Sequence, residues 1–351
     1  MNLDDRSRLS AIDAGGMLAT IDALPEQLEQ AWGRALSLAL PKGGAPRHIV
    51  FAGMGGSAIG ADLAVVHARR SATAGLTVWR DYGLPGWARG EETLVVVSSF
   101  SGETEEALSS FDAARRGGAR RVVFTSGGTL RRRAEEAGDP VWPIDHPGPP
   151  RAAVGHGFAY SLGLLARLAQ TGDPSREVAQ AVAAMRAQRE TLRVESPVVA
   201  NPAKRMAGQL MDRWPLFFGA GVLAPVARRW RTQVNEMAKA PAQHEELPES
   251  DHNTVSGTAG PESLIGKTMA VFLRATHDEP ALTRRVEATR HILMVEGYNT
   301  DLIDGVGDGR LAQQWTCLHY GDYAACYLAL AYGIDPTPIP AIEQLKEVLR
   351  G

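Results

Sequence analysis

The sequence predicts an α/β protein with two mainly parallel β-sheets, each flanked by helices on both faces, and a C-terminal helix after them. Short apolar runs alternate with helix-like segments over residues 47–144, and short glycine-rich connections join them. An aromatic residue followed by two spaced glycines at residues 51–55 recurs at residues 217–221. This repeat indicates that the chain contains two copies of one fold.

Composition limits the class of protein. The 351 residues include 44% apolar residues and 37 glycines, which suits an ordered two-domain protein. The net charge of -3, with no long basic stripe, argues against nucleic acid as a partner. The N-terminus lacks the pattern of a signal peptide, and no apolar run approaches the ~20 residues that span a bilayer. We therefore expect a cytoplasmic protein that does not interact with membranes.

The first half of the chain predicts one α/β domain after an N-terminal helix. Apolar spacings of three and four residues predict a helix over residues 17–40. Asp173 as N-cap and Pro174 at the first helical position mark the second of two helices after the domain. The expected strands are 47–52, 75–80, 93–98, 121–125 and 140–144, and the expected helices are 57–69, 103–116, 129–137, 157–170 and 174–193.

The second half repeats the first with one difference. The apolar run at residues 268–273 mirrors that at 93–97, but the loop after it, 275–279, lacks the serines of the first copy. A long helix is expected near 309–332 and a short one near 339–349. Cys317 and Cys326 fall on the long helix, where their spacing favours two core residues over a disulfide or metal site. The expected domains are an N-terminal helical segment 1–45, a phosphate-binding domain 46–150, a helical connector 151–200, a second domain 201–335 and a C-terminal helix 336–351.

Two loops carry the chemistry of the first domain. Each follows an apolar strand and begins a helix, so each presents backbone N–H groups at a helix N-terminus together with hydroxyl groups. This combination favours the terminal phosphate of a phosphorylated small molecule. The expected phosphate-binding residues are Gly55, Gly56, Ser57, Ser99, Ser101 and Thr104.

A dinucleotide is the alternative ligand. The spacing of Gly53, Gly55 and Ala58 also satisfies the loose dinucleotide-binding fingerprint, and Asp81 lies where a ribose-binding acid belongs. That interpretation gives no role to the serine-rich loop. The phosphate interpretation has its own difficulty, because carboxylates at Glu103, Glu105 and Glu106 repel a phosphate unless they point to solvent.

Several further motifs carry a resemblance to a known family. They are Pro150-Arg151-Ala152-Ala153, Asn235-Glu236-Met237-Ala238-Lys239-Ala240-Pro241, Glu249-Ser250-Asp251-His252-Asn253, Gly321-Asp322-Tyr323 and Asp335-Pro336-Thr337-Pro338. The two glycine- and serine-rich loops resemble those of the sugar-isomerase (SIS) domain. Together with these motifs, they resemble the bifunctional phosphoglucose/phosphomannose isomerase family from about residue 45 to the end. The resemblance implies two SIS domains and the interconversion of glucose 6-phosphate or mannose 6-phosphate with fructose 6-phosphate.

The resemblance also implies a role for three residues. Aldose–ketose interconversion needs one base that moves a proton between C1 and C2, and Glu236 resembles the family's base. His252 resembles the group that opens the sugar ring, which implies a homodimer whose active sites are shared between subunits. Arg151 resembles the cation beside the enediolate. The implied chemistry needs no cofactor, and the histidines and carboxylates at residues 244–252 have no recognisable metal-ligand spacing.

One part of the expected site is less defined. Related isomerases place a polar side chain from the long C-terminal helix over the sugar, but no lysine occurs between Lys267 and Lys346. Gln313, Thr316, Gln314 and His319 are the polar candidates, and the first two are the expected substrate contacts. Two other functions stay open: an isomerase of an amino-sugar phosphate, and a sensor that binds sugar phosphate without catalysis. A sensor has no need of Glu236 and His252.

Overall fold

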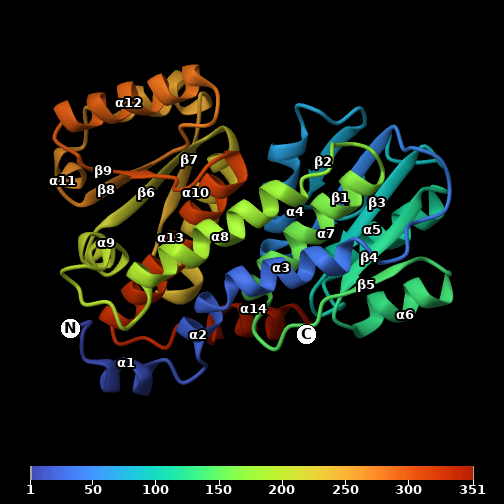
Figure 1. Cartoon of the computed structure of the whole chain (residues 1–351), viewed down its shortest axis with the longest axis horizontal. Helices are drawn as coiled ribbons and strands as arrows, with labels where there is room; N and C mark the ends of the chain where they lie inside the picture. The colour runs from blue at the N-terminus through green and yellow to red at the C-terminus, as the bar shows by residue number, and fades with distance from the viewer. Residues whose placement is uncertain (1, 351) are drawn as a thin grey trace. The chain divides into compact units, whose positions relative to one another are not determined.

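The computed structural model describes residues 2–350 and contains two parallel β-sheets with helices packed on both faces of each (Figure 1). The chain divides into two compact units. We call Leu24–Ala179 the first-sheet unit, and the described residues of Met1–Ala23 and Gln180–Gly351 the second-sheet unit. The α/β fold class is confirmed, whereas the domain boundaries expected from the sequence stay a prediction.

The first-sheet unit is built on five parallel strands in the order β2-β1-β3-β4-β5. Gly53 at the end of β1 lies opposite Ser98 at the end of β3. The two loops that follow these strands therefore start side by side at one edge of the sheet. The strands are β1 (His48–Gly53), β2 (Gly75–Trp79), β3 (Thr93–Ser98), β4 (Arg120–Thr125) and β5 (Val141–Pro143).

Helices cover both faces of this sheet. On one face, Phe111 of α5 and Leu130 of α6 pack against the valines of the central strands. On the other face, Tyr160 of α7 makes an edge contact with the ring of Phe124 on β4, and Gly60 of α4 lies directly against the backbone of Gly157. The helices are α3 (Leu24–Ala35), α4 (Gly55–Ala68), α5 (Glu105–Arg116), α6 (Gly128–Glu136), η1 (Pro150–Ala153) and α7 (Val154–Arg167), and α8 (Ser175–Leu192) begins in this unit.

The second-sheet unit has four parallel strands in the order β7-β6-β8-β9. This is the order of β2, β1, β3 and β4 in the first sheet, so the prediction that the chain repeats one fold is confirmed. The strands are β6 (Trp214–Ala220), β7 (Gln243–Leu247), β8 (Thr268–Arg274) and β9 (Asn299–Asp304).

The two faces of the second sheet are covered by different helices. Val286 and Leu293 of α12 pack on the face that carries Phe218 and Phe272. Trp230 of α10 contacts Phe217 on the other face. The remaining elements are α1 (Arg6–Ile12), α2 (Met17–Asp22), α9 (Pro202–Leu210), η2 (Gly221–Leu223), α10 (Ala224–Met237), η3 (Glu249–His252), η4 (Thr254–Gly257), α11 (Glu262–Ile265), α12 (Pro280–Val295), α13 (Arg310–Ala331) and α14 (Pro340–Arg350).

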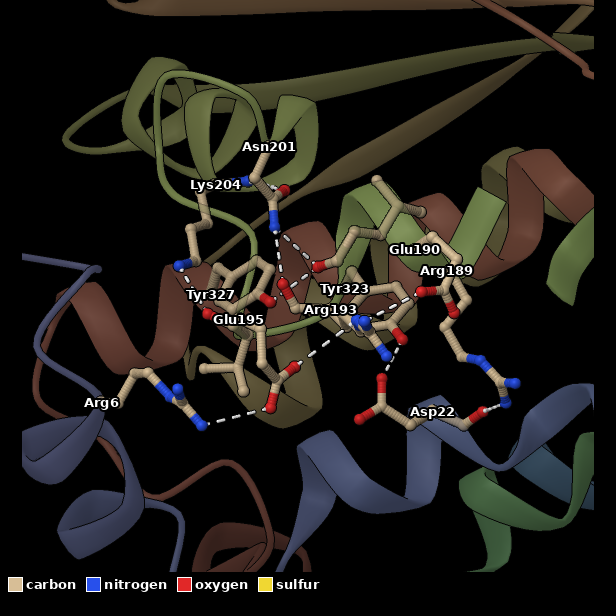
Figure 2. A network of polar contacts seen from close by, with 12 residues as sticks. Arg6, Asp22, Arg189, Glu190, Arg193, Glu195, Asn201, Lys204, Tyr323 and Tyr327 are labelled. Carbon is tan, nitrogen blue, oxygen red and sulfur yellow. Dashed lines mark hydrogen bonds and ion pairs between the residues drawn. The ribbon is translucent and has the colours of Figure 1, made fainter. Parts of the chain in front are cut away.

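A polar network joins the N-terminal segment to the helices of the second-sheet unit (Figure 2). The buried amine of Lys204 donates to Asp4 at 3.1 Å. Tyr323 on α13 donates a short hydrogen bond to the Asp22 carboxylate, and Arg189 donates to the Asp22 carbonyl at 2.7 Å. These bonds explain why α1 and α2 belong to the second-sheet unit although they begin the chain.

The predicted helix over 17–40 is wrong in two respects. It is two helices, α2 and α3, and the second ends at Ala35. The break at Ala23 precedes Pro25, which has no N–H group and favours the first turn of a new helix. Most other element boundaries agree within about three residues. Cys317 and Cys326 are buried core residues on α13, as expected. No helix in the described chain is long and apolar enough to cross a membrane.

Candidate functional site

The first loop is a tight turn between β1 and α4. Met54 is extended, and Gly55 has a φ of +46°, a conformation that favours glycine. A Cβ atom on Gly56 would lie 2.8 Å from the backbone N of Arg151, so no side chain fits there. Because the first N–H groups of a helix have no partner within that helix, this turn presents donors suited to an anion.

The second loop is organised by hydroxyl groups. Ser99 is buried; its Oγ donates to Thr104 Oγ1 at 2.9 Å and accepts from Gly102 N at 3.1 Å. Ser57 Oγ, in the first turn of α4, accepts from Phe100 N at 3.1 Å. This bond holds the two loops together. The hydroxyl of Ser101 lies on the exposed part of the loop, where it accepts from Glu103 N at 3.2 Å.

The acidic residues of the second loop are directed to other partners. Glu103 Oε1 accepts a hydrogen bond from Thr129 N at 2.7 Å, at the start of α6, and this bond lowers the pKa of the Glu103 carboxyl. Glu105 is exposed and accepts from the hydroxyl of Tyr82 at 3.2 Å. The two carboxylates therefore have defined contacts outside the hydroxyl cluster, which removes part of the electrostatic objection to a bound phosphate.

Arg151 lies in η1, the short turn that precedes α7, and it is 2% exposed. The backbone of this turn contacts Gly56 at the start of α4. A buried guanidinium is costly unless negative or polar groups compensate it. Because the backbone of this turn contacts Gly56, it places a cationic residue beside the first loop within one compact unit.

Glu236 lies in the second-sheet unit, half-buried near the end of α10. The residues on either side of it complete the end of that helix. Asn235 Nδ2 donates to the carbonyl of Ala240 at 2.8 Å, and Lys239 Nζ donates to the carbonyls of Glu236 at 2.7 Å and Met237 at 3.1 Å. Lys239 therefore satisfies two carbonyl groups at the C-terminus of α10, and Asn235 holds the segment that follows the helix.

Besides Lys239, a second cationic residue, Arg231, interacts electrostatically with Glu236. Burial and the neighbouring Arg228 lower the pKa of the Arg231 guanidinium, and the charge of Glu236 partly offsets this shift. Arg228 itself donates to Glu246 at 2.8 Å. Burial beside Arg228 and Arg231 also lowers the pKa of His244 to about 4. The sequence does not distinguish either arginine, because charged residues on a helix are most often solvent-facing.

Helix α10 is fixed to α13 by the Gly321-Asp322-Tyr323 motif. Asp322 accepts two hydrogen bonds from Arg229, at 2.9 and 2.7 Å, and one from Gln233 at 3.0 Å. All three residues are at most 3% exposed. A Cβ atom on Gly321 would lie 2.1 Å from the indole nitrogen of Trp230, so the helices can only approach this closely with glycine there.

His252 ends the short helix η3 and is exposed. The preceding Asp251 accepts hydrogen bonds from Arg285 and Thr289 on α12, both at 2.7 Å. Asn253 Oδ1 accepts from Thr254 N at 2.7 Å. Asp251 therefore anchors the turn to α12, next to the exposed imidazole of His252.

The polar residues of α13 hold neighbouring loops. Thr316 is fully buried; its Oγ1 donates to the carbonyl of Val306 at 3.0 Å and accepts from Val306 N at 2.8 Å. Gln313 bonds to Thr276 Oγ1 at 2.8 Å and His277 N at 3.0 Å. His319 Nε2 contacts the carbonyl of Ile21 at 2.9 Å. A substrate contact by Gln313 or Thr316 stays a prediction.

The second copy of the loop pair contains its own carboxylate. Gly221 has a φ of +53°, like Gly55 in the first copy, and Val222 N follows it. Asp278 Oδ2 accepts from Val222 N at 2.8 Å, and its side chain is 3% exposed. Arg310 lies 3.5 Å from Asp278 Oδ1. The start of the helical segment that leads into α10 is thus occupied by an internal negative charge.

Comparison with known proteins identifies the family. Residues 199–349 match the family described as the bacterial phospho-glucose isomerase C-terminal SIS domain. A bifunctional phosphoglucose/phosphomannose isomerase of Caldicellulosiruptor bescii is 34% identical over 338 residues, which cover 95% of this chain and 98% of that protein. This chain belongs to the bifunctional phosphoglucose/phosphomannose isomerase family. The resemblance that its motifs carry is confirmed.

Other members and solved structures agree with this assignment. A bifunctional phosphoglucose/phosphomannose isomerase of Aquifex aeolicus is 33% identical over 303 residues, covering 86% of this chain and 90% of that protein. A glucose-6-phosphate isomerase-like protein of Thermus thermophilus superposes with a TM-score of 0.64 at 21% identity, over 96% of this chain and 98% of that one. The structural likeness confirms the two SIS folds.

The expected site residues fall into two groups in this isomerase-family chain. The two loops and Arg151 come together in the first-sheet unit, whereas Glu236 and His252 belong to the second-sheet unit and lie on different elements of it. Within residues 2–350, no cluster of three His, Cys, Asp or Glu side chains is arranged to hold a metal ion. Another residue to which the sequence did not point is Gln27, whose Nε2 donates to the carbonyl of Ala152, next to Arg151, at 2.9 Å. Its only signal was a polar residue on the apolar face of a helix.

Proposed function

We propose that this chain interconverts glucose 6-phosphate and mannose 6-phosphate with fructose 6-phosphate, without a cofactor. The observation that carries the proposal, together with membership of the family, is the hydrogen bond from Phe100 N to Ser57 Oγ. It joins a helix N-terminus and a hydroxyl-rich loop into one anion-binding surface. Tetrahedral phosphate oxygens accept many hydrogen bonds and are favoured by the helix dipole.

The substrate phosphate binds at this surface. The N–H groups at the start of α4 and the exposed hydroxyl of Ser101 face the anion, while buried Ser99 maintains the shape of the loop. The proposed set is Gly55, Gly56, Ser57, Ser99, Ser101 and Thr104. Arg151, beside Gly56, supplies positive charge to the enediolate that forms when the proton leaves the sugar carbon.

Glu236 carries the proton between C1 and C2. The half-buried position of Glu236 suits a carboxylate that must be basic enough to take a carbon-bound proton and still return it. The pair of Asn235 and Lys239 fixes the end of α10, which limits the motion of the base. A base that returns the proton to one face of C2 of the planar enediolate yields one C2 epimer. Dual activity therefore requires that the enediolate can also present the opposite face of C2 to Glu236.

His252 opens the sugar ring in the active site of a second copy of the chain. Its exposure on an anchored turn suits a side chain that reaches out of its own unit. A histidine titrates near neutrality and is suited to protonate the ring oxygen. The proposal therefore includes a homodimer with shared active sites. It also includes a cytoplasmic location, because sugar phosphates are found in the cytoplasm.

The first test is turnover. Wild-type protein treated with a chelator is assayed for fructose 6-phosphate formed from glucose 6-phosphate and, separately, from mannose 6-phosphate. Glu236→Gln should lower kcat by about 10²–10⁴ with both sugars, because a general base typically contributes this much. Glu296→Gln, an exposed glutamate at the end of α12, is the matched control. Binding of sugar phosphate without turnover by the wild type would contradict the proposal and favour a sensor.

The second test addresses the shared site. Glu236→Gln and His252→Ala are purified separately, mixed in equal amounts and allowed to exchange subunits. In a twofold dimer, half the mixed population is heterodimeric and each heterodimer has one intact site, so activity should recover to about a quarter of wild type. If His252 acts within its own chain, the mixture will be no more active than its two components.

A further inference from the structure

Gln27 is a buried polar residue on the apolar face of α3. Its neighbours Leu24, Leu28 and Ala31 on that helix are at most 3% exposed, and Gln27 itself is 9% exposed. Burying a carboxamide is unfavourable unless both its oxygen and its nitrogen are hydrogen-bonded. A leucine or alanine would suit an ordinary core position better, so the amide must be explained by what it contacts.

The carboxamide of Gln27 bridges the turn that contains Arg151. Its Nε2 donates to the carbonyl of Ala152 at 2.9 Å, and its Oε1 accepts from Gly155 N at 2.8 Å. Nε2 also lies 3.4 Å from His146 Nδ1, on the segment that leads into the turn. One side chain therefore contacts the polypeptide before, within and after η1.

The fit around this carboxamide is close. A Cβ atom on Gly155 would lie 2.6 Å from Gln27 Oε1, so only glycine leaves room for the amide. On its other side, the same turn contacts Gly56 through the backbone of Arg151. A continuous series of contacts thus runs from α3, through the Arg151 turn, to the start of α4, all within the first-sheet unit.

We propose that Gln27 is a positioning residue for the isomerase: it holds the turn that contains Arg151 in the position from which Arg151 stabilises the enediolate. This inference rests on the proposed function, because it assumes that Arg151 stabilises the intermediate. A displacement of about 1 Å in a positioned catalytic group can cost about 10²-fold in rate. Helix α3, which packs against α7, is then also part of the catalytic apparatus.

The test replaces Gln27 with methionine, which has nearly the same shape but neither donates nor accepts strongly. Gln27→Met should lower kcat about 10–100-fold, while the inhibition constant of inorganic phosphate changes less than about threefold, because the loop hydroxyls are untouched. Gln30→Met, an exposed glutamine on the same helix, is the matched control. If Gln27→Met does not fold, Gln27→Glu, which keeps the acceptor for Gly155 N and loses the donor to Ala152, is judged by the same measurements.

A double-mutant cycle separates positioning from general loss of stability. If Gln27 acts through Arg151, then Gln27→Met should have less than about a twofold effect on kcat in the Arg151→Ala background. Equal losses in both backgrounds, or an unchanged kcat in Gln27→Met, would overturn the inference. Wild-type enzyme without turnover would instead overturn the proposed function and, with it, the role of Gln27. An active wild type with an unimpaired Arg151→Ala variant would overturn the assumption about Arg151.

Discussion

Asp322 provides a direct test of how α10 is held in place. Replacing Asp322 with asparagine keeps the shape of the side chain but removes its charge. The change leaves the guanidinium of Arg229, which is 2% exposed, without its carboxylate partner in the protein interior. It also replaces one oxygen acceptor by an amide donor that faces the donors of Arg229 and Gln233.

The magnitude follows from burial and geometry. The pair is bidentate, with both hydrogen bonds at or below 2.9 Å, and both side chains are at least 96% buried. Removing one partner of such a pair typically costs about 3–5 kcal/mol, mostly through the charge left behind. We expect Asp322→Asn to lower the free energy of unfolding of the second-sheet unit by about 3 kcal/mol.

The assay is urea unfolding followed by tryptophan fluorescence, because buried Trp230 lies beside the pair. The control is Glu135→Gln, which breaks the exposed ion pair with Arg131 and should cost less than about 0.5 kcal/mol. If Asp322→Asn loses no more stability than the control, the buried pair does not hold α10 as the structure indicates.

Three further outcomes are expected. Burial lowers the pKa of His156 to about 4, below its unfolded value, so its contribution to stability is complete above about pH 6.5 and is lost as pH falls towards 4. Because the pKa of His244 is lowered in the same way, the test is a difference between variants: on going from pH 7 to pH 5, His156→Phe should lose about 2 kcal/mol less than the wild type. Gly56→Ala should weaken phosphate inhibition at least about tenfold through the contact with the Arg151 backbone, whereas Gly33→Ala, where the added methyl meets nothing, should not. Asp278→Ala should destabilise the fold by about 1–3 kcal/mol, and sulfate should restore stability better than chloride at equal ionic strength. Equal losses in the wild type and His156→Phe between pH 7 and pH 5, equal inhibition in the two glycine variants, or equal effects of the two salts would contradict these predictions.

The local parts of the fold could be predicted from the sequence, because they depend on neighbouring residues. The strand β3, fully apolar between Thr93 and Ser98, matches its expected range, and the glycines around Met54 marked the start of α4 within two residues. The division of the N-terminal helix was missed although Pro25 marked it. There the apolar periodicity continued across the break and concealed the local signal.

The candidate site was less predictable, since its contacts join residues far apart in the sequence. Ser57 and Phe100 meet because β1 and β3 are parallel neighbours that end at the same edge of the sheet, and this pairing follows from the folded structure. Gln27 donates a hydrogen bond to Ala152, which is 125 residues away in the sequence, and no local sequence pattern predicts that contact. The surroundings of Arg231 likewise depend on how α10 lies against β7, which the sequence does not state.

The carboxylate of Asp278 has a consequence for the stoichiometry of the enzyme. A duplicated fold begins with two equivalent anion sites per chain, and each would compete for phosphate esters in the cell. Because the carboxylate of Asp278 fills one of them, a single anion site per chain is left, and under the proposed function it is the site that binds the sugar phosphate. The second copy is then free to diverge as a carrier of Glu236 and His252. Titration with inorganic phosphate should accordingly count one equivalent per chain, and the symmetry of the two copies persists in the order of the strands and in the positive φ of Gly55 and Gly221.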